Sequence, residues 1–207
     1  MTTTSMSAVP VRRAAVASAT PYPWPYQGDL DLEKLAVVAC RDSFWRLPGP
    51  FSDAADERLT TLAKRLRASG ALVLEVTSLP ARPGYRGPLQ SGASDAMLER
   101  QGFATDGFIE AAGTNAFYGS ALDDLLRSHH RSDLIIAGWG LEGPVHSTLR
   151  AANDRGYECL LVPDASTPLD PELVTASCEM VRFSGGIFGA FAPCNAVLET
   201  IDTPIRS

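Results

Sequence analysis

The sequence predicts an α/β fold: a three-layer α/β/α arrangement built around a Rossmann-like parallel sheet. Three observations predict it. Short apolar runs of strand length recur along the chain, segments with helical spacing of apolar residues separate them, and glycines end several of those segments. Strands that alternate with amphipathic helices indicate a parallel sheet covered on both faces. With 207 residues, the chain is long enough for one domain of ordinary size.

The expected strands are continuous apolar runs, as in buried parallel strands. They cover residues 35–41, 71–76, 133–139 and 157–163, and a last strand or sheet edge is expected within 185–192. A long polar connection, residues 77–106, is rich in proline and glycine and holds one short expected helix near SDAMLERQ. Connections of that length often belong to functional sites.

The expected helices bury one apolar stripe each. One covers residues 53–69 and stops at Gly70, and a second is built around Leu122, Leu125 and Leu126. A third begins at Pro144 and runs to Arg155, and a fourth is capped by Asp170 with proline in its first turn. The inward residues expected on the last two are Val145, Thr148, Leu149, Ala152, Val174, Cys178 and Val181.

We divide the chain into a disordered leader, residues 1–21, and one domain, residues 22–207. The leader is small, polar and weakly basic and has no apolar segment typical of an export signal. The domain opens with an arm, YPWPYQGDL (residues 22–30), whose prolines disfavour a helix or a central strand. Its aromatic side chains are expected to pack on the body or on a neighbouring subunit.

Composition narrows the classes of function. A net charge of −6 offers no attraction to nucleic acid or to an anionic membrane, and no apolar run approaches the length of a membrane span. The four cysteines have no CxxC spacing, which together with the leader predicts a reducing, cytoplasmic location. Of the 18 basic residues only Lys34 and Lys64 are lysines, which limits the choice of a catalytic lysine.

In open parallel sheets, ligands bind outside the carboxyl ends of the strands. Three segments fall at such positions, and they read ACRDSFW, GTNAFYG and GWGLEGPV. In that order they resemble the isochorismatase-like cysteine hydrolases over residues 22–199. The similarity is strongest to the biuret and ureidoacrylate hydrolase branch, through PWPYQGDL, NAFYGSAL, LEGPVHSTLRAANDRGYECLLVPDAS and MVRFSGGIFGAFA.

The resemblance implies a catalytic triad: an Asp at the end of the first strand as general base, a Lys that stabilises charge, and a nucleophilic Cys at a helix start. This sequence departs from the family at all three positions. Alignment through the shared motifs places Ala39 at the Asp, Ala111 at the Lys and Pro144 at the Cys. Proline has neither a thiol nor an amide N–H, so a donor of the oxyanion hole is lost with the nucleophile.

We find no replacement for the triad in the sequence. Cys40 follows Ala39, but neighbouring strand residues face opposite sides of the sheet, so we interpret it as a core thiol. Lys34 lies at the wrong end of the first strand and Lys64 on a covering helix. The metal-binding Asp/His/His set of nicotinamidases has no counterpart, so neither a metal nor another cofactor is expected.

The remaining candidates surround the expected site, and each also has a structural interpretation. Asp42, Glu142 and His146 are polar, whereas Phe44, Trp45, Phe117 and Trp139 would line a pocket or simply belong to the core. Glu142 also suits the start of a helix, where its carboxylate complements the dipole. Trp139 is expected to fill the space that a substrate occupies in active relatives.

Two hypotheses of function follow. The first is a pseudoenzyme that has lost cysteine-dependent hydrolysis and serves as a ligand-binding or partner subunit. The alternative is a hydrolase of a small amide, ureido or enol-ether compound that uses Asp42, Glu142 and His146. The expected partners are copies of the same chain, as a dimer or tetramer, or an active paralogue in a hetero-oligomer, with a small molecule as ligand.

Overall fold

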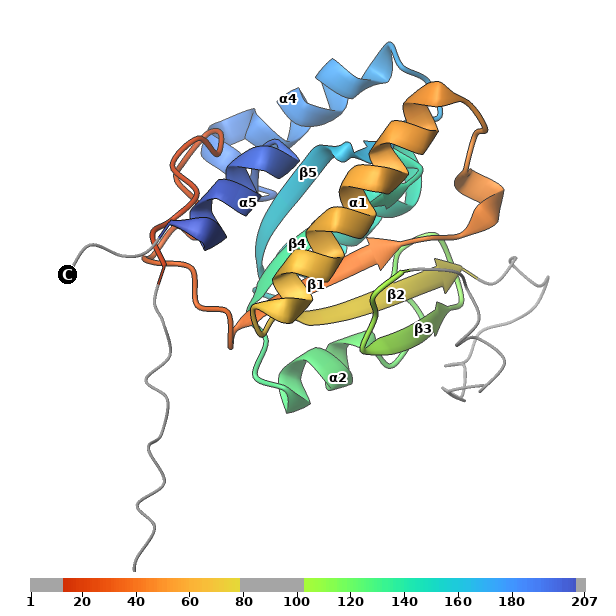
Figure 1. Ribbon diagram of the computed structural model, residues 1–207. Coiled ribbons are helices and arrows are strands. Elements are labelled where there is room, and N and C mark those ends of the chain that lie inside the picture. Colours follow the sequence, from red (N-terminus) through yellow and green to blue (C-terminus); the bar gives the residue numbers. More distant parts are fainter. Residues whose placement is uncertain (1–12, 79–102, 204–207) are drawn as a thin grey trace, which may run out of the picture.

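The computed structural model describes residues 13–78 and 103–203. Within them the strands form one parallel sheet in the order β3-β2-β1-β4-β5-β6 (Figure 1). The strands are β1 (Leu35–Cys40), β2 (Leu72–Ser78), β3 (Gly107–Ala111), β4 (Asp133–Trp139), β5 (Glu158–Thr167) and β6 (Ala190–Phe191). The predicted α/β class with a parallel sheet is confirmed.

Helices cover both faces of the sheet (Figure 1). Helices α1 (Pro50–Ala68) and α5 (Cys194–Asp202) pack on one face, and α2 (Leu122–Ser128) and α3 (His146–Asn153) pack on the other. Helix α4 (Leu173–Gly186) adds Val181 to the second face. Two short segments complete the fold at the carboxyl ends of β1 and β4: a 3₁₀ helix, η1 (Ser43–Trp45), and a π-helical turn, η3 (Leu141–Val145).

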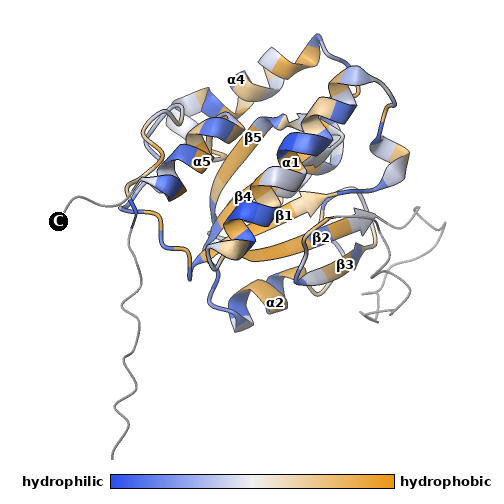
Figure 2. Cartoon of the chain, viewed as in Figure 1, coloured by the Kyte–Doolittle hydropathy of each residue, from blue (hydrophilic) through white to orange (hydrophobic). Residues whose placement is uncertain are grey.

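The central strands are apolar because both of their faces are covered. Every residue of β1 and of β4 is buried, and Figure 2 shows the sheet in apolar colours between helices that are polar on their outer sides. Alternate residues enter different cores: Val37 and Ala39 pack towards α1, whereas Val38 and Cys40 pack towards α3. The inward residues expected on the third helix, Val145, Thr148, Leu149 and Ala152, are buried as predicted.

The strand order places β1 beside β4, with β2 and β3 on one side and β5 and β6 on the other. The chain therefore leaves β1 and β4 in opposite directions. In open α/β sheets, ligands bind at the carboxyl ends of the two strands where such a reversal occurs. The functional site predicted from the sequence falls at this end.

Part of the leader that was predicted to be disordered, residues 1–21, is ordered in the structure. Residues 13–21 pack on the body: Val16 is fully buried, and Thr20 exchanges backbone hydrogen bonds with Phe191 of β6 at 2.9 Å. The arm that follows buries Trp24 completely in the chain's own core and leaves Tyr26 exposed. An ordered edge results because Thr20 satisfies backbone groups that β6 would otherwise leave unpaired. Residues 1–12 lie outside the described residues.

Two other boundaries differ from the prediction. The expected strand within 185–192 is only Ala190–Phe191, because Gly185 and Gly186 have φ of +77° and +92° and turn the chain at the end of α4. Helix α3 begins at His146 rather than at Pro144, for a reason given below. The short helix expected near SDAMLERQ lies outside the described residues. No helix in the described ranges is long and apolar enough to cross a membrane.

Candidate functional site

The turn between β4 and α3 owes its shape to a missing backbone donor. An α-helix beginning here would bring the N–H of Pro144 to the carbonyl oxygen of Gly140, but proline has no N–H. That oxygen instead accepts from Gly143, at 3.0 Å, and from Val145, at 3.3 Å. The second bond skips Pro144 and widens the turn into the π-helical turn η3. Pro144 therefore lies inside this turn, which corrects its predicted place as the first helical residue.

A tryptophan lies against this turn. Gly140 precedes the turn and Gly143 lies within it, and a Cβ atom built on Gly143 would lie 2.9 Å from Cζ3 of Trp45. A Cβ built on Gly140 would lie 3.0 Å from Cβ of Trp45 and 2.8 Å from Cδ of Pro144. The two glycines thus leave room for the side chain of Trp45 against the backbone that leads to Pro144. The expectation that Trp139 fills the substrate space of active relatives stays a prediction.

Trp139 is held in a charged cluster instead. It is 9% exposed, and its indole N–H donates a hydrogen bond to Asp56 of α1. The guanidinium of Arg46 donates to the same carboxylate at 2.7 Å, and the guanidinium of Arg41 lies 4.8 Å from the indole ring centre. Arg41 also pairs with the buried Glu75 at 3.3 Å. This cluster was missed in the sequence because its members lie on α1, β2, β4 and the connection between β1 and α1.

Ala39 and Ala111 are both fully buried. They belong to different cores: Ala39 packs with residues of α1 and α5, and Ala111 packs with residues of α2 and α3. Neither methyl group can transfer a proton or stabilise charge. The side chains at the three positions aligned with the family triad are therefore two methyl groups and a proline ring, also buried.

Cys40 is a buried thiol, as predicted. Its Sγ donates a weak hydrogen bond to Oγ1 of Thr148 at 3.7 Å, and the same oxygen accepts from the backbone N–H of Ala116 at 2.9 Å. Burial raises the pKa of the Cys40 thiol to about 12. A thiol in this state is a poor nucleophile at neutral pH. Burial likewise raises the pKa of Cys159, Cys178 and Cys194.

The three polar candidates each make local structural contacts. One carboxylate oxygen of Asp42 accepts from the backbone N–H of Phe44 and begins η1. Glu142 accepts from the backbone N–H groups of Leu169 and Asp170, at 2.9 and 3.0 Å, and so ties the loop before α4 to η3. These bonds explain both carboxylates without a catalytic role.

His146 is buried in the interface between α3 and α4. Its Nδ1 accepts from Nε of Arg150 at 3.2 Å, so the proton lies on Nε2, which faces the carbonyl oxygen of Ser177 at 3.3 Å. Burial lowers the pKa of His146, which keeps the ring neutral. The apolar candidates separate as well: Phe44 is 80% exposed, whereas Phe117 is buried and stacks on Tyr157.

Three pockets indent the described surface away from this turn. The first, of about 750 Å³, lies at the amino ends of β1, β4 and β5, the second borders Phe103 and Arg67, and the third borders Asp164 and Cys194. None of the three is lined by Ala39, Ala111 or Pro144. Over residues 13–78 and 103–203, no group of three or more His, Cys, Asp or Glu residues is arranged to hold a metal ion.

The model of the isochorismatase domain matches residues 37–194, which is most of the chain. The chain belongs to the isochorismatase family. Solved structures of the family have the same fold. An isochorismatase family protein from Burkholderia thailandensis is 20% identical with a TM-score of 0.64, covering 83% of this chain and 97% of that one. An isochorismatase from Pseudomonas putida KT2440 is 22% identical with a TM-score of 0.61, covering 81% and 91%.

A nicotinamidase from Staphylococcus aureus is 13% identical with a TM-score of 0.59, covering 77% of this chain and 99% of that one. At such identities the likeness extends to the fold and not to a substrate. The family and fold predicted from the sequence are thus confirmed. The similarity to the biuret and ureidoacrylate hydrolase branch stays a prediction.

Proposed function

We propose that this isochorismatase-family protein does not carry out cysteine-dependent hydrolysis and acts as a ligand-binding or partner subunit. The observation that carries the proposal is the turn after β4. Pro144 occupies the position aligned with the nucleophile, and the side chain of Trp45 lies against Gly140 and Gly143, which precede it. A substrate carbonyl at this turn would meet neither a thiol nor the N–H of residue 144.

The state of the cysteines supports the same conclusion. Catalytic thiols are partly exposed and have a depressed pKa, because only the thiolate attacks. All four cysteines of the chain have a raised pKa, and burial is the main cause in each. Relocation of the nucleophile to any of these four positions would require removing that burial.

The alternative, a hydrolase that uses Asp42, Glu142 and His146, has no specific observation in its favour. The two carboxylates accept hydrogen bonds from backbone N–H groups that they cap, and His146 is a neutral, buried link between two helices. A general acid or base needs its proton-carrying atom within reach of a substrate. Each of the three side chains instead makes contacts that stabilise a different part of the fold.

A role as a partner subunit is supported by exposed apolar side chains on α4 and directly after it. Leu173, Met180, Phe183 and Ile187 are each more than two-fifths exposed, and such surfaces often mark protein interfaces. We expect a second copy of this chain to cover them. Sedimentation of the wild type should give a dimer or tetramer, and Phe183→Ser should shift it towards the monomer. Deleting the arm is a poor test because Trp24 belongs to the chain's own core.

A cysteine that attacked the carbonyl of an amide or ureido substrate would form a covalent S-acyl or S-carbamoyl intermediate, and this intermediate provides the test of the proposal. The purified protein is mixed with biuret, ureidoacrylate or nicotinamide, quenched in acid and examined by intact-mass spectrometry. We expect only the unmodified mass at every time point. An adduct that maps to any of the four cysteines would overturn the proposal, and an active family member run in parallel verifies that the quench traps the intermediate.

A further inference from the structure

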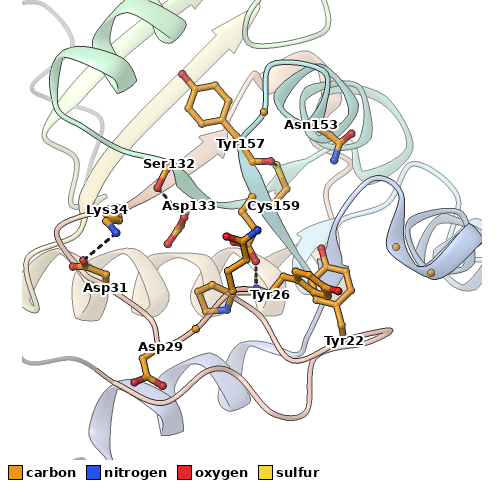
Figure 3. A pocket seen from close by; sticks show the side chains of 17 residues that line it. Tyr22, Tyr26, Asp29, Asp31, Lys34, Ser132, Asp133, Asn153, Tyr157 and Cys159 are labelled. Carbon is orange, nitrogen blue, oxygen red and sulfur yellow. Dashed lines mark hydrogen bonds and ion pairs between the residues drawn. The ribbon is translucent and has the colours of Figure 1, made fainter.

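The pocket of about 750 Å³ lies at the amino ends of the strands (Figure 3). The turn that holds Pro144 lies at the other end of the strands, after β4. The wall of the pocket combines the residues that precede or begin β1, β4 and β5 with the aromatic arm. Its volume is in the range of small-molecule sites. The mechanism of the family does not use this edge of the sheet.

A buried carboxylate with a free oxygen faces this pocket. Asp133, the first residue of β4, is only 8% exposed, and Figure 3 shows its carboxylate directed into the pocket. Oδ1 accepts a hydrogen bond from the hydroxyl of Ser132 at 2.9 Å. Within the described residues, no donor reaches the second oxygen. This oxygen is open to the pocket, where a ligand with an N–H group can donate a hydrogen bond to it.

The pocket is strongly acidic. Four carboxylates line it, Asp29, Asp31, Asp133 and Glu158, against a single lysine. That lysine, Lys34, lies 3.8 Å from Asp31 and is 58% exposed, and its charge also acts on Asp133, so one cation is set against four carboxylates. Burial raises the pKa of both Asp133 and Glu158, and the charge of Asp133 adds to the effect on Glu158. A cation in the pocket would relieve the repulsion among these carboxylates.

Two tyrosines of the arm give the pocket aromatic surface. Tyr22 and Tyr26 meet edge to face, with ring centres 5.1 Å apart, whereas the ring of Tyr157, which also lines the pocket, stacks on Phe117 in the core. Burial raises the pKa of Tyr22 to about 12, so its ring remains a neutral phenol. The faces of such rings attract cations. Carboxylates and aromatic faces together select a positively charged organic group.

We propose that this pocket binds a small organic cation that carries N–H donors, an alkylammonium or a guanidinium, with Asp133 as its anchoring carboxylate. The size of the pocket and the absence of a metal-type ligand cluster in the described part of the chain favour an organic cation over a metal ion. The free oxygen of Asp133 favours N–H donors over a quaternary ammonium. The proposal does not depend on whether the other edge of the sheet is catalytic.

Calorimetric titration with four probes tests the proposal. Putrescine and agmatine carry N–H cations, choline carries a cation without N–H, and 1,4-butanediol is neutral. At constant ionic strength we expect putrescine or agmatine to bind at least about 10-fold more tightly than choline, since one charge-assisted hydrogen bond is worth roughly 1.5–3 kcal/mol. The neutral diol should not bind.

Two matched variants test whether the cation binds at Asp133. Asp133→Asn should weaken binding of the N–H probe by at least about 10-fold. Asp154→Asn, which removes an exposed carboxylate that does not line the pocket, should change it by less than about 2-fold. Choline binding as well as putrescine, equal binding by both variants, or no binding of either N–H probe at about 10 mM would each overturn the proposal. If Asp133→Asn does not fold, the four probes on the wild type decide.

Discussion

The backbone N–H of Val145 donates to the carbonyl oxygen of Gly140 at 3.3 Å, one residue further along the chain than in an α-helix. This bond exists because Pro144, between them, has no N–H to offer. The fold thus tolerates proline at the family's nucleophile position by opening the turn, and it does so without distorting α3, which begins normally at His146.

If the turn merely accommodates Pro144, Pro144→Ala should change stability little. The new N–H can bond to Gly140, a gain of about 1 kcal/mol, while the more flexible unfolded chain costs a similar amount. We expect a net change in the free energy of unfolding within about 1 kcal/mol by urea denaturation. A loss of several kcal/mol would mean that the proline itself holds the turn together.

Gly138 on β4 should tolerate no side chain. It has φ of +135°, and a Cβ atom there would lie 2.0 Å from the carbonyl oxygen of Cys40 on the neighbouring strand. We expect Gly138→Ala to cost on the order of 3 kcal/mol or more. Gly156→Ala is the matched control, since Gly156 also has positive φ but open space around it, and it should cost only about 1–2 kcal/mol. Equal losses in the two variants would show that the clash is absent.

The cysteines should react slowly with iodoacetamide at neutral pH. Burial raises the pKa of Cys40 to about 12 and, with a smaller contribution from nearby carboxylates, raises that of Cys178 and Cys194 to about 11. Because the thiolate is the reactive form, labelling should accelerate about tenfold per unit from pH 7 to pH 9. Glutathione in the same tube provides an unburied reference. A fast, pH-independent labelling phase at pH 7 would reveal an activated cysteine and contradict this account.

Asp133 should make the protein less stable as the pH rises. Its pKa is raised in the folded state, so the folded protein holds this proton more tightly than the unfolded chain does. The free energy of unfolding therefore falls as the pH rises from the pKa of the unfolded chain to the raised pKa of the folded state. Lys34, Asp31, Glu158 and Ser132 are the groups that face it. Asp133→Asn should therefore raise Tm at pH 7 by roughly 2–4 °C and have little effect below about pH 4. A lower Tm at pH 7 would mean that the charge is stabilised.

The fold was predictable because its signals are local. Buried parallel strands read as continuous apolar runs, and the helices between them have apolar stripes, so β1, β4 and α3 could be placed within a few residues. The sequence could not predict that residues 13–21 are ordered, because Val16 and Thr20 are held by contacts with distant parts of the chain. A small polar composition gives no sign of such contacts.

The sequence predicted which positions correspond to the family's site, but not which side chains contact one another there. Motif spacing pointed to Ala39, Ala111 and Pro144, and strand alternation placed Cys40 on the face opposite Ala39. Neither signal predicts that Trp45 lies on the turn, because that contact depends on two glycines far from Trp45 in the sequence. The acidic pocket was equally hidden, since its carboxylates come from the arm and from the starts of separate strands.

The most direct test of the central claim is turnover. The purified wild type is incubated at pH 7.5 with biuret, ureidoacrylate, nicotinamide and isochorismate, and the products are followed by chromatography beside an active isochorismatase-family hydrolase. We expect no product above a blank without protein for any of the four compounds. Turnover of any one of them at the rate of the active relative would contradict it.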